Sequence, residues 1–418
     1  MRVSQQPISP EHLQTLFKIT QAMNSTLDFD EVLHTVIDSM MEVCNAQRGF
    51  LMVADEDGQL ELRIARGLRT DEVGHDVPYS ATIVNQVIQT RETLLTNNAM
   101  YDENFMTSGS IVAKGIRAIL CAPMIVNGRL IGAVYVDTLG LTNFTDSDRD
   151  LLSAVAGQAG VAIENARLYT VAVEKGRLER ELQMAREIQE GLLPKTMPHV
   201  PGYELAARWE AAREVAGDFY DAFHVDDDEF GIVIADVSDK GAAAAMFMAV
   251  ARTLIRTHAQ SNYSPVETLS RTNDLILDDA QNGMFVTVYY SVFMPNGHSI
   301  HVNAGHNPPM LYRAASNEVS MMAIGGRAIG WFPNNPLQDV EVDLQPGDVI
   351  VYYTDGVTEA ENIHGEFFGE ARLQQAIIES AGQHADIILK HIVQRVDEFV
   401  GEAAQFDDLT LFVLRYTG

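Results

Sequence analysis

The chain has 418 residues and carries 58 acidic against 29 basic side chains, a net charge of −29. So strong a negative charge repels nucleic-acid phosphates and anionic lipid, and we expect neither nucleic acid nor a membrane as a partner. Apolar residues make up 46% of the chain, an ordinary globular mixture with material for two or three domain cores. The sequence shows neither a membrane-spanning apolar stretch nor a secretory signal at its start, so we expect a cytoplasmic protein.

The first 166 residues predict helices around one antiparallel sheet. Apolar residues recur at helical spacing over residues 10–46, which indicates two helices, the second beginning at Asp28 or Asp30. Two pairs of strand-like runs then predict hairpins: residues 48–53 with 60–65, and residues 118–126 with 130–136. The second hairpin turns at Asn127-Gly128, a strong two-residue turn signal. A further helix is expected over residues 146–168.

Two stretches of this region resemble a GAF domain, a small-ligand sensor and dimerisation module. They are residues 119–137, ILCAPMIVNGRLIGAVYVD, and the closing run from Phe144 to Leu152. The resemblance covers residues 11–166 and implies a homodimer and a small-molecule ligand whose identity the sequence does not give. Members that bind cyclic nucleotides carry Asn-Lys, Phe and Asp-Glu at set spacings. Asn97, Asp102 and Phe105 do not follow that order here, so a cyclic nucleotide is not the ligand we expect.

Residues 167–193 predict a linker helix with a heptad pattern. The a positions are Leu168, Lys175, Leu182 and Gln189, and the d positions are Val171, Leu178, Ala185 and Leu192. The pattern favours a short two-stranded coiled coil, weakened by the polar residues at two a positions. A single solvated amphipathic helix is the alternative. Pro194 ends the helix.

Residues 200–418 predict a third part with many strands and separate helices. Strand-like runs are expected at residues 231–235, 284–294, 299–304, 310–313, 319–323, 340–344, 349–354 and 409–415. Helices are expected at residues 241–258, 371–381 and 385–401. Many antiparallel strands beside segregated helix pairs favour the α+β class, with a sandwich of sheets.

Four short acidic motifs stand in this third part, most of them at the end of an apolar, strand-like run. They read Glu214-Val-Ala-Gly-Asp-Phe-Tyr-Asp221, Ile234-Ala-Asp-Val-Ser-Asp-Lys-Gly241, Tyr353-Thr-Asp-Gly-Val-Thr-Glu359 and Phe406-Asp-Asp-Leu-Thr410. A single aspartate at a strand end is usually a turn former or a helix cap. Several buried together are costly unless cations neutralise them. Fixed carboxylate oxygens are the ligands that Mg²⁺ or Mn²⁺ prefers, so the motifs predict a metal site.

These motifs resemble those of the metal-dependent protein phosphatase 2C superfamily, in particular its bacterial branch of stage-II-sporulation-E and RsbU-type enzymes. Residues 182–194, LQMAREIQEGLLP, and residues 304–309, AGHNPP, carry the same resemblance. It implies an αββα sandwich in which two Mn²⁺ or Mg²⁺ ions activate a water that attacks phosphoserine or phosphothreonine. It also implies a phosphoprotein substrate such as a STAS-type anti-anti-sigma factor in partner switching.

The resemblance assigns roles residue by residue. Asp236 would bridge both ions, Asp218 would lie on one side of the pair, and Asp355 and Asp407 would complete the other, with Asp408 as the alternative to Asp407. The backbone carbonyl of Val237 would be a further ligand. Glu214 and Asp221 are at best candidates for contacting the metal ligands without binding the ions themselves. Asp239 is expected to face solvent or to bind a third, weaker ion. We expect His306 and Asn307 to have a structural role in their loop. The alternative function is an inert sensor scaffold that docks a partner.

Overall fold

The computed structural model describes residues 10–55, 58–68, 79–97, 99, 116–139, 143–226, 228–261, 264–279, 283–322 and 325–418. The chain forms two compact units, the first spanning Met1–Arg177 and the second Leu178–Gly418. Helix α5 (Asp146–Leu192) runs through the division, so the predicted helix at residue 146 and the predicted linker helix are one element. Within the described ranges, no helix is both long and apolar enough to cross a lipid bilayer.

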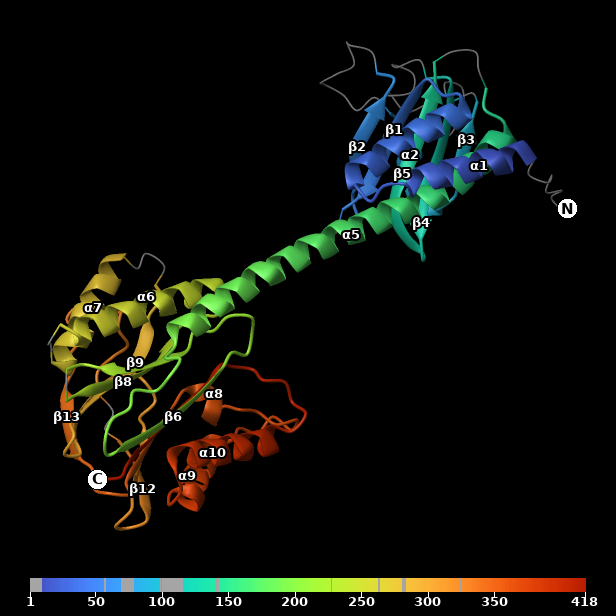
Figure 1. The fold of residues 1–418 in the computed structure, drawn as a ribbon. Coiled ribbons are helices and arrows are strands. Elements are labelled where there is room, and N and C mark those ends of the chain that lie inside the picture. The colour runs from blue at the N-terminus through green and yellow to red at the C-terminus, as the bar shows by residue number, and fades with distance from the viewer. Residues whose placement is uncertain are drawn as a thin grey trace. The chain divides into compact units, whose positions relative to one another are not determined.

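The first unit is built on a five-stranded antiparallel sheet (Figure 1). Its strand order is β2-β1-β5-β4-β3. The strands are β1 (Arg48–Ala54), β2 (Leu60–Arg66), β3 (Leu94–Thr96), β4 (Ala118–Val126) and β5 (Arg129–Thr138). The helices are α1 (Pro10–Met23), α2 (Phe29–Cys44), α3 (Ala81–Thr90) and the first part of α5. The two predicted hairpins are therefore confirmed as β1–β2 and β4–β5.

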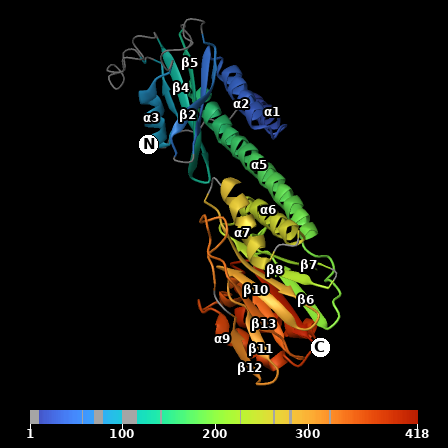
Figure 2. The same ribbon diagram turned by 90° about the vertical axis from the view of Figure 1, so that its left-hand side faces the viewer.

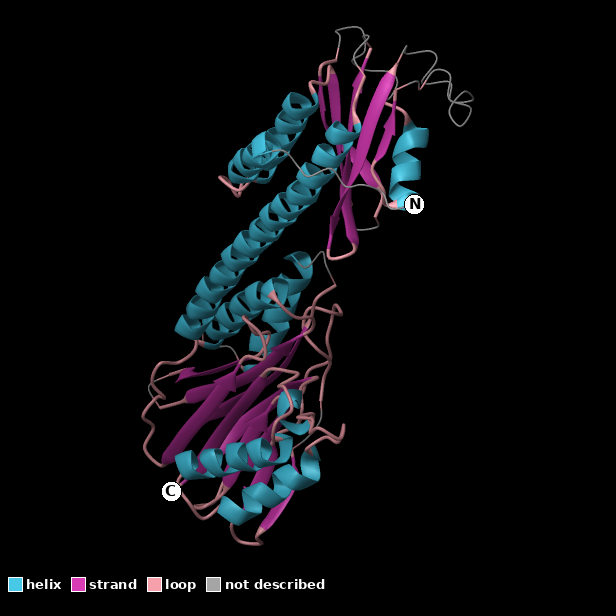
Figure 3. Ribbon diagram, turned by 90° about the vertical axis from the view of Figure 1, so that its right-hand side faces the viewer, coloured by secondary structure: helices cyan, strands magenta, loops and turns pink. Residues whose placement is uncertain are grey.

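Helices cover both faces of this sheet, because its central strands are apolar on both sides. Apolar side chains of α1, α2 and α5 form one core with one face of the sheet, and α3 packs on the other. Figure 3 shows the helices of the first unit on either side of the strands. Asp28 caps α2 by accepting a hydrogen bond from the backbone N–H of Glu31, as one of the two predicted starts requires. The residues Asp102 and Phe105 of the cyclic-nucleotide pattern lie outside the described residues.

The second unit contains two five-stranded antiparallel sheets. One has the order β13-β10-β9-β8-β7 and the other β12-β11-β14-β15-β6. The strands are β6 (Tyr203–Glu210), β7 (Phe219–His224), β8 (Phe230–Val237), β9 (Val286–Phe293), β10 (His298–Ala304), β11 (Met310–Arg313), β12 (Glu318–Met321), β13 (Asp339–Asp343), β14 (Val349–Tyr353) and β15 (Leu409–Tyr416). The helices are α6 (Ala242–Ala259), α7 (Pro265–Asp279), α8 (Asp355–Thr358), α9 (Gly369–Ser380) and α10 (Ala385–Val400).

The two sheets pack face to face and helices cover the outside, which gives the predicted αββα sandwich (Figure 2). Helices α6 and α7 pack on the β7–β10 side, and α9 and α10 pack on the sheet that contains β14 and β15. Along β14 the side chains alternate as strand geometry requires: Ile350 and Tyr352 face the other sheet, whereas Val351 and Tyr353 face the helices. The inward register continues to the hydroxyl residue Thr354, where the candidate site begins.

The sequence did not predict β6, β7 and α7. Strand β7 begins directly after Asp218, inside the first acidic motif, and strand β6 is the edge strand that pairs with β15. Both runs mix polar residues with apolar ones, so the apolar runs used for the prediction passed over them.

Candidate metal and phosphatase site

Four aspartates of the predicted motifs lie at neighbouring strand ends of the second unit, and we call Asp218, Asp236, Asp355 and Asp407 the aspartate cluster. Asp218 precedes β7, Asp236 is near the end of β8, Asp355 follows β14 and Asp407 precedes β15. Strands β7 and β8 belong to one sheet, and β14 and β15 to the other. The fold thus brings the ends of both sheets, and the four predicted ligands, to one region.

Asp218 is the most deeply buried member of the cluster, with 2% of its surface exposed. Its Oδ2 accepts hydrogen bonds from the hydroxyls of Thr354, at 2.6 Å, and Thr410, at 2.9 Å. The pKa of Asp218 is nevertheless raised well above its ordinary value, first by burial and then by the charges of Asp236 and Asp408. The hydroxyls therefore hold the carboxyl in place without cancelling the cost of its charge.

Asp236 lies at the electrostatic centre of the cluster. Burial, followed by the charge of Asp355, raises the pKa of Asp236 to about 7, although a hydrogen bond with Asp218 opposes the shift. Asp355 behaves in the same way, since burial and then Asp407 raise its pKa. Mutual repulsion between buried carboxylates is the condition that bound cations relieve.

Asp407 and Asp408 have different partners, although they are neighbours in sequence. The Asp407 carboxylate contacts the Lys240 ammonium at 2.9 Å and is about a third exposed. Both oxygens of Asp408 instead accept backbone hydrogen bonds, from Ala212 at 2.8 Å and Gly217 at 2.9 Å. Asp408 therefore holds the loop that leads to Asp218, whereas the Asp407 carboxylate pairs with Lys240 and accepts a hydrogen bond from the N–H of Asp408.

Two glycines beside the cluster lie close to backbone carbonyls, and the approach is closest at Gly356. A Cβ added to Gly356 would lie 1.9 Å from the carbonyl oxygen of Asp408, and one added to Gly217 would lie 3.1 Å from the carbonyl oxygen of Val237. Glycine lets the backbone approach this closely because it has no Cβ. A larger residue at position 217 would crowd the carbonyl that the resemblance assigns to a metal.

The donor set of the cluster fits hard divalent cations. Within the described residues no three Asp, Glu, His or Cys side chains converge on one point as a ready-made cage. Mg²⁺ does not need one, because it keeps several waters and is commonly held by one or two carboxylates. The oxygen-only donors and the raised pKa of Asp218, Asp236 and Asp355 agree with such ions.

The other acidic candidates lie apart from the cluster. Asp221 is buried, but its carboxylate pairs with Arg252 at 2.9 Å and Arg256 at 3.0 Å, both on α6, so it ties β7 to that helix. Glu214 and Asp239 are exposed to solvent, and the Asp239 side chain accepts a hydrogen bond from the backbone of Lys240.

One contact that the sequence did not reveal is made by Gln189, near the end of α5. Gln189 is 3% exposed, and its side-chain amide bonds both backbone groups of Ala216. The amide nitrogen donates to the carbonyl at 2.8 Å, and the amide oxygen accepts from the N–H at 3.2 Å. Ala216 lies two residues before Asp218, so this a position of the heptad is buried within the second unit. By contrast, the earlier apolar heptad positions Leu168, Val171 and Leu178 are exposed.

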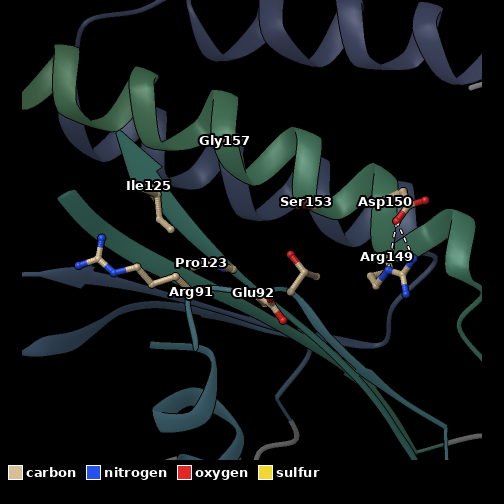
Figure 4. Close-up of a pocket in the computed structure, with 9 residues that line it drawn as sticks. Arg91, Glu92, Pro123, Ile125, Arg149, Asp150, Ser153 and Gly157 are labelled. Carbon is tan, nitrogen blue, oxygen red and sulfur yellow. Dashed lines mark hydrogen bonds and ion pairs between the residues drawn. The ribbon is translucent and has the colours of Figure 1, made fainter. Parts of the chain in front are cut away.

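Two cavities have different relations to the cluster. One, of about 280 Å³, is lined by Gly356 and Asp407 and by further acidic and apolar residues, and so borders the cluster. The other, of about 450 Å³, lies in the first unit between β4, the segment before β3, and α5 (Figure 4). Its two arginines are already engaged, Arg91 by the carbonyl of Gly128 and Arg149 by Asp146 and Asp150. The second cavity therefore presents polar groups that already have partners.

Comparisons with known proteins agree with both units. Residues 226–417 match the family model for stage II sporulation protein E, and residues 26–164 match the model for GAF domains. Protein IcfG of Synechocystis is 30% identical over 306 residues, which cover 65% of this chain and 47% of IcfG. Phosphoserine phosphatase RsbU of Bacillus subtilis is 27% identical over 239 residues, 57% of this chain and 70% of RsbU.

Further matches extend this comparison. Phosphoserine phosphatase RsbP of Bacillus subtilis is 26% identical and, like IcfG, is spanned over about half of its length, 45%. Among solved structures, the SiaA-PP2C domain of Pseudomonas aeruginosa has a TM-score of 0.52 at 22% identity, and the match covers 59% of this chain and 99% of that one. This likeness supports the fold of the second unit. The chain therefore joins a GAF domain to a domain of the stage II sporulation protein E family, which has the fold of the SiaA-PP2C domain.

Proposed function

We propose that the chain is a metal-dependent serine/threonine protein phosphatase regulated by its GAF domain. The observation that carries the proposal is the aspartate cluster, in which carboxylates from both sheets are buried together against their own repulsion. An inert scaffold has no reason to keep so unfavourable an arrangement. The names of RsbU and RsbP, both phosphoserine phosphatases, support the same reaction class.

Each residue of the cluster has a distinct place in the proposed mechanism. Two divalent ions, Mn²⁺ or Mg²⁺, would supply an activated water and neutralise the phosphoryl oxygens. Asp236 would hold both ions, and Asp218, fixed by Thr354 and Thr410, would hold one of them. Asp355 and Asp407 would hold the other, with Asp408 orienting the loop before Asp218. The carbonyl of Val237 is a further proposed ligand.

The proposed substrate is a phosphorylated signalling protein, most simply a STAS-type anti-anti-sigma factor. A phosphoserine on a protein surface can reach a site at strand ends, and the cavity of about 280 Å³ gives room beside Asp407. We also propose a homodimer formed through the GAF domain and the exposed apolar positions Leu168, Val171 and Leu178 of α5.

Regulation is proposed to act through the end of α5. Gln189 clamps Ala216, and Asp408 clamps the neighbouring Gly217, so a shift of the helix would move the backbone that leads to Asp218. A ligand of the GAF domain would then change phosphatase activity by shifting or rotating α5. The two hydrogen bonds of Gln189 give this idea a specific contact to test.

The activity is tested by phosphate release from an aryl phosphate with Mn²⁺, using the full chain. We expect Asp236→Asn to lower kcat by about 10³-fold or more, because the bridging carboxylate sets the charge stabilisation of the whole site. Asp228→Asn is the matched control, since Asp228 is exposed in the turn at the opposite end of the same hairpin. Activity that survives Asp236→Asn would contradict the assigned site. A wild-type chain inactive on this substrate and on phosphorylated STAS proteins would favour the scaffold.

A further inference from the structure

The motif Ala304–Pro309 has no place in the proposed chemistry, yet its backbone is tightly fixed. Gly305 has a φ of +77° and pairs with Val288 of β9. A Cβ there would lie 2.7 Å from the backbone nitrogen of Ala328, so only glycine fits. The side chain of Asn303 then bonds both backbone groups of His306, accepting from its N–H at 2.8 Å and donating to its carbonyl at 3.0 Å. These contacts hold His306 in one position.

The His306 ring reaches toward the aspartate cluster through one intermediate, Thr287. The ring is buried, and its Nδ1 lies 2.8 Å from the hydroxyl oxygen of Thr287. That hydroxyl lies 3.3 Å from the carbonyl oxygen of Asp236, its partner in the β8–β9 register. Among the described residues, the other ring nitrogen, Nε2, has no hydrogen-bond partner. The backbone of Tyr353 also lies near the ring as a weaker partner, so among the described residues the contact with Thr287 is the hydrogen bond of ordinary length that the ring makes.

The hydrogen bonds from His306 through Thr287 to the carbonyl of Asp236 can all form with one assignment of donors and acceptors. If the Thr287 hydroxyl donates to the Asp236 carbonyl, its oxygen accepts from Nδ1–H of a neutral His306. Burial, which lowers the pKa of His306 to about 4, keeps the ring neutral. The carbonyl at the end of this chain belongs to the peptide plane that joins Asp236 to Val237. This single peptide plane connects the residue with the proposed bridging carboxylate, Asp236, to the residue with the proposed carbonyl ligand, Val237.

We propose that Thr287 and His306 are positioning residues that hold the Asp236–Val237 peptide in the orientation required for metal binding. The inference rests on the proposed function, since it assigns a metal to Asp236. It gives the AGHNPP motif, which supplies none of the proposed metal ligands, a role. Neither residue contacts the reacting atoms, so both act through Asp236.

The test compares two substitutions of Thr287 in the full chain by Mn²⁺ titration calorimetry. Thr287→Val keeps the shape of the side chain and suits a strand, as its neighbours Val286 and Val288 show, but it removes the hydroxyl. We expect it to weaken Mn²⁺ binding by about 10-fold or more, the usual effect of losing a group that orients a metal ligand. Thr287→Ser restores the hydroxyl and should restore the affinity.

A second pair of variants tests the other end of the contact. His306→Asn keeps an N–H close to the position of Nδ1, whereas His306→Leu removes it, so the leucine variant should bind Mn²⁺ more weakly than the asparagine variant. Urea unfolding of the same proteins separates positioning from folding. Wild-type Mn²⁺ affinity in Thr287→Val, or equal affinity in the two His306 variants, would overturn the inference, even where the urea midpoint falls. A wild-type chain that binds no Mn²⁺ would instead remove the proposed function itself.

Discussion

Both units of the chain bury charged side chains, and the comparison is between an ion pair in the first unit and a cluster of like charges in the second. In the first unit the guanidinium of Arg48 faces the carboxylate of Asp137, with 2% and 0% of the side chains exposed. Two parallel hydrogen bonds of 2.7 Å join them. In the second unit Asp218, Asp236 and Asp355 are like charges, and burial raises the pKa of each.

The contrast separates a structural charge from a functional one. In a bidentate pair the two charges neutralise each other through two parallel hydrogen bonds, so the pair needs no bound ion. A cluster of like charges is incomplete without cations, and such strain is typical of sites that bind or react. The comparison can be tested because different spectroscopic signals follow the unfolding of the two units. Both tryptophans, Trp209 and Trp331, belong to the second unit, so tryptophan fluorescence follows that unit, whereas circular dichroism follows both.

The largest stability effect is expected from breaking the pair in the first unit. Arg48→Met removes the bidentate partner of the buried Asp137 carboxylate, and breaking a buried ion pair typically costs about 3–5 kcal/mol. In urea, the transition seen by circular dichroism alone should move to lower concentration, while the fluorescence transition stays in place. Arg66→Met is the matched control, because Arg66 pairs with Asp38 near the surface, where a pair is worth roughly 0–1 kcal/mol. Equal effects of the two variants would contradict the structural role of Arg48.

Adding Mn²⁺ should have the complementary effect on the second unit alone. At 100 times its Kd an ion that binds only the folded state adds about 2.7 kcal/mol to the free energy of unfolding. The fluorescence transition should therefore move to higher urea, and the transition of the first unit should not. Asp236→Asn should remove the shift, and Asp228→Asn should keep it. A shift that persists in Asp236→Asn would place the ion elsewhere.

A smaller effect on stability is expected from the contact between α5 and the loop that leads to Asp218. Gln189→Met keeps the length of the side chain but leaves the N–H and carbonyl of Ala216 buried without partners, at a cost of about 1–3 kcal/mol. It should also lower Mn²⁺-dependent phosphate release, because the backbone before Asp218 is released. Gln183→Met, on the exposed side of the same helix, is the control. Loss of stability with unchanged activity would confine Gln189 to a structural role.

Strand periodicity and turn chemistry made much of this fold predictable. The Asn127-Gly128 hairpin, the Asp28 cap and the apolar strand that ends near Asp236 each follow from local rules, and the structure has all three. Thr354 and Thr410 were also within reach of the sequence. Each continues the alternate, inward-facing positions of its strand, and both hydroxyls meet Asp218. The acidic motifs alone do not indicate these hydroxyls, because finding them requires the alternation of side chains along β14 and β15.

Other contacts were beyond the sequence because a pattern names a face and not its partner. The heptads place Gln189 on the apolar side of α5, and only the fold shows that Ala216 covers it. Asp221 appeared to belong with the other acidic residues, whereas its partners Arg252 and Arg256, four residues apart, present one side of α6. The position of Thr287 opposite Asp236 likewise depends on register between distant strands.

A neutral group, His301, gives a third way to bury polarity. The ring is 1% exposed and lies between the hydroxyls of Ser291 and Ser299, each at 2.8 Å. Burial lowers the pKa of His301 from 6.5 to about 3. Below pH 6.5 the unfolded chain therefore binds a proton that the folded chain refuses, so this group lowers stability as the pH falls toward 3. The loss approaches about 1.4 kcal/mol per pH unit.

The buried carboxylates act in the opposite direction, since their raised pKa lets the folded chain bind protons first. The contribution of His301 is therefore read as a difference between proteins. Between pH 6.5 and pH 4.5, the urea stability of the second unit should fall less steeply in His301→Gln than in the wild type. His364→Gln, at an exposed position, should keep the wild-type slope. If His301→Gln also kept it, the ring would accept its proton while folded, and His301 would not contribute to the pH dependence of stability.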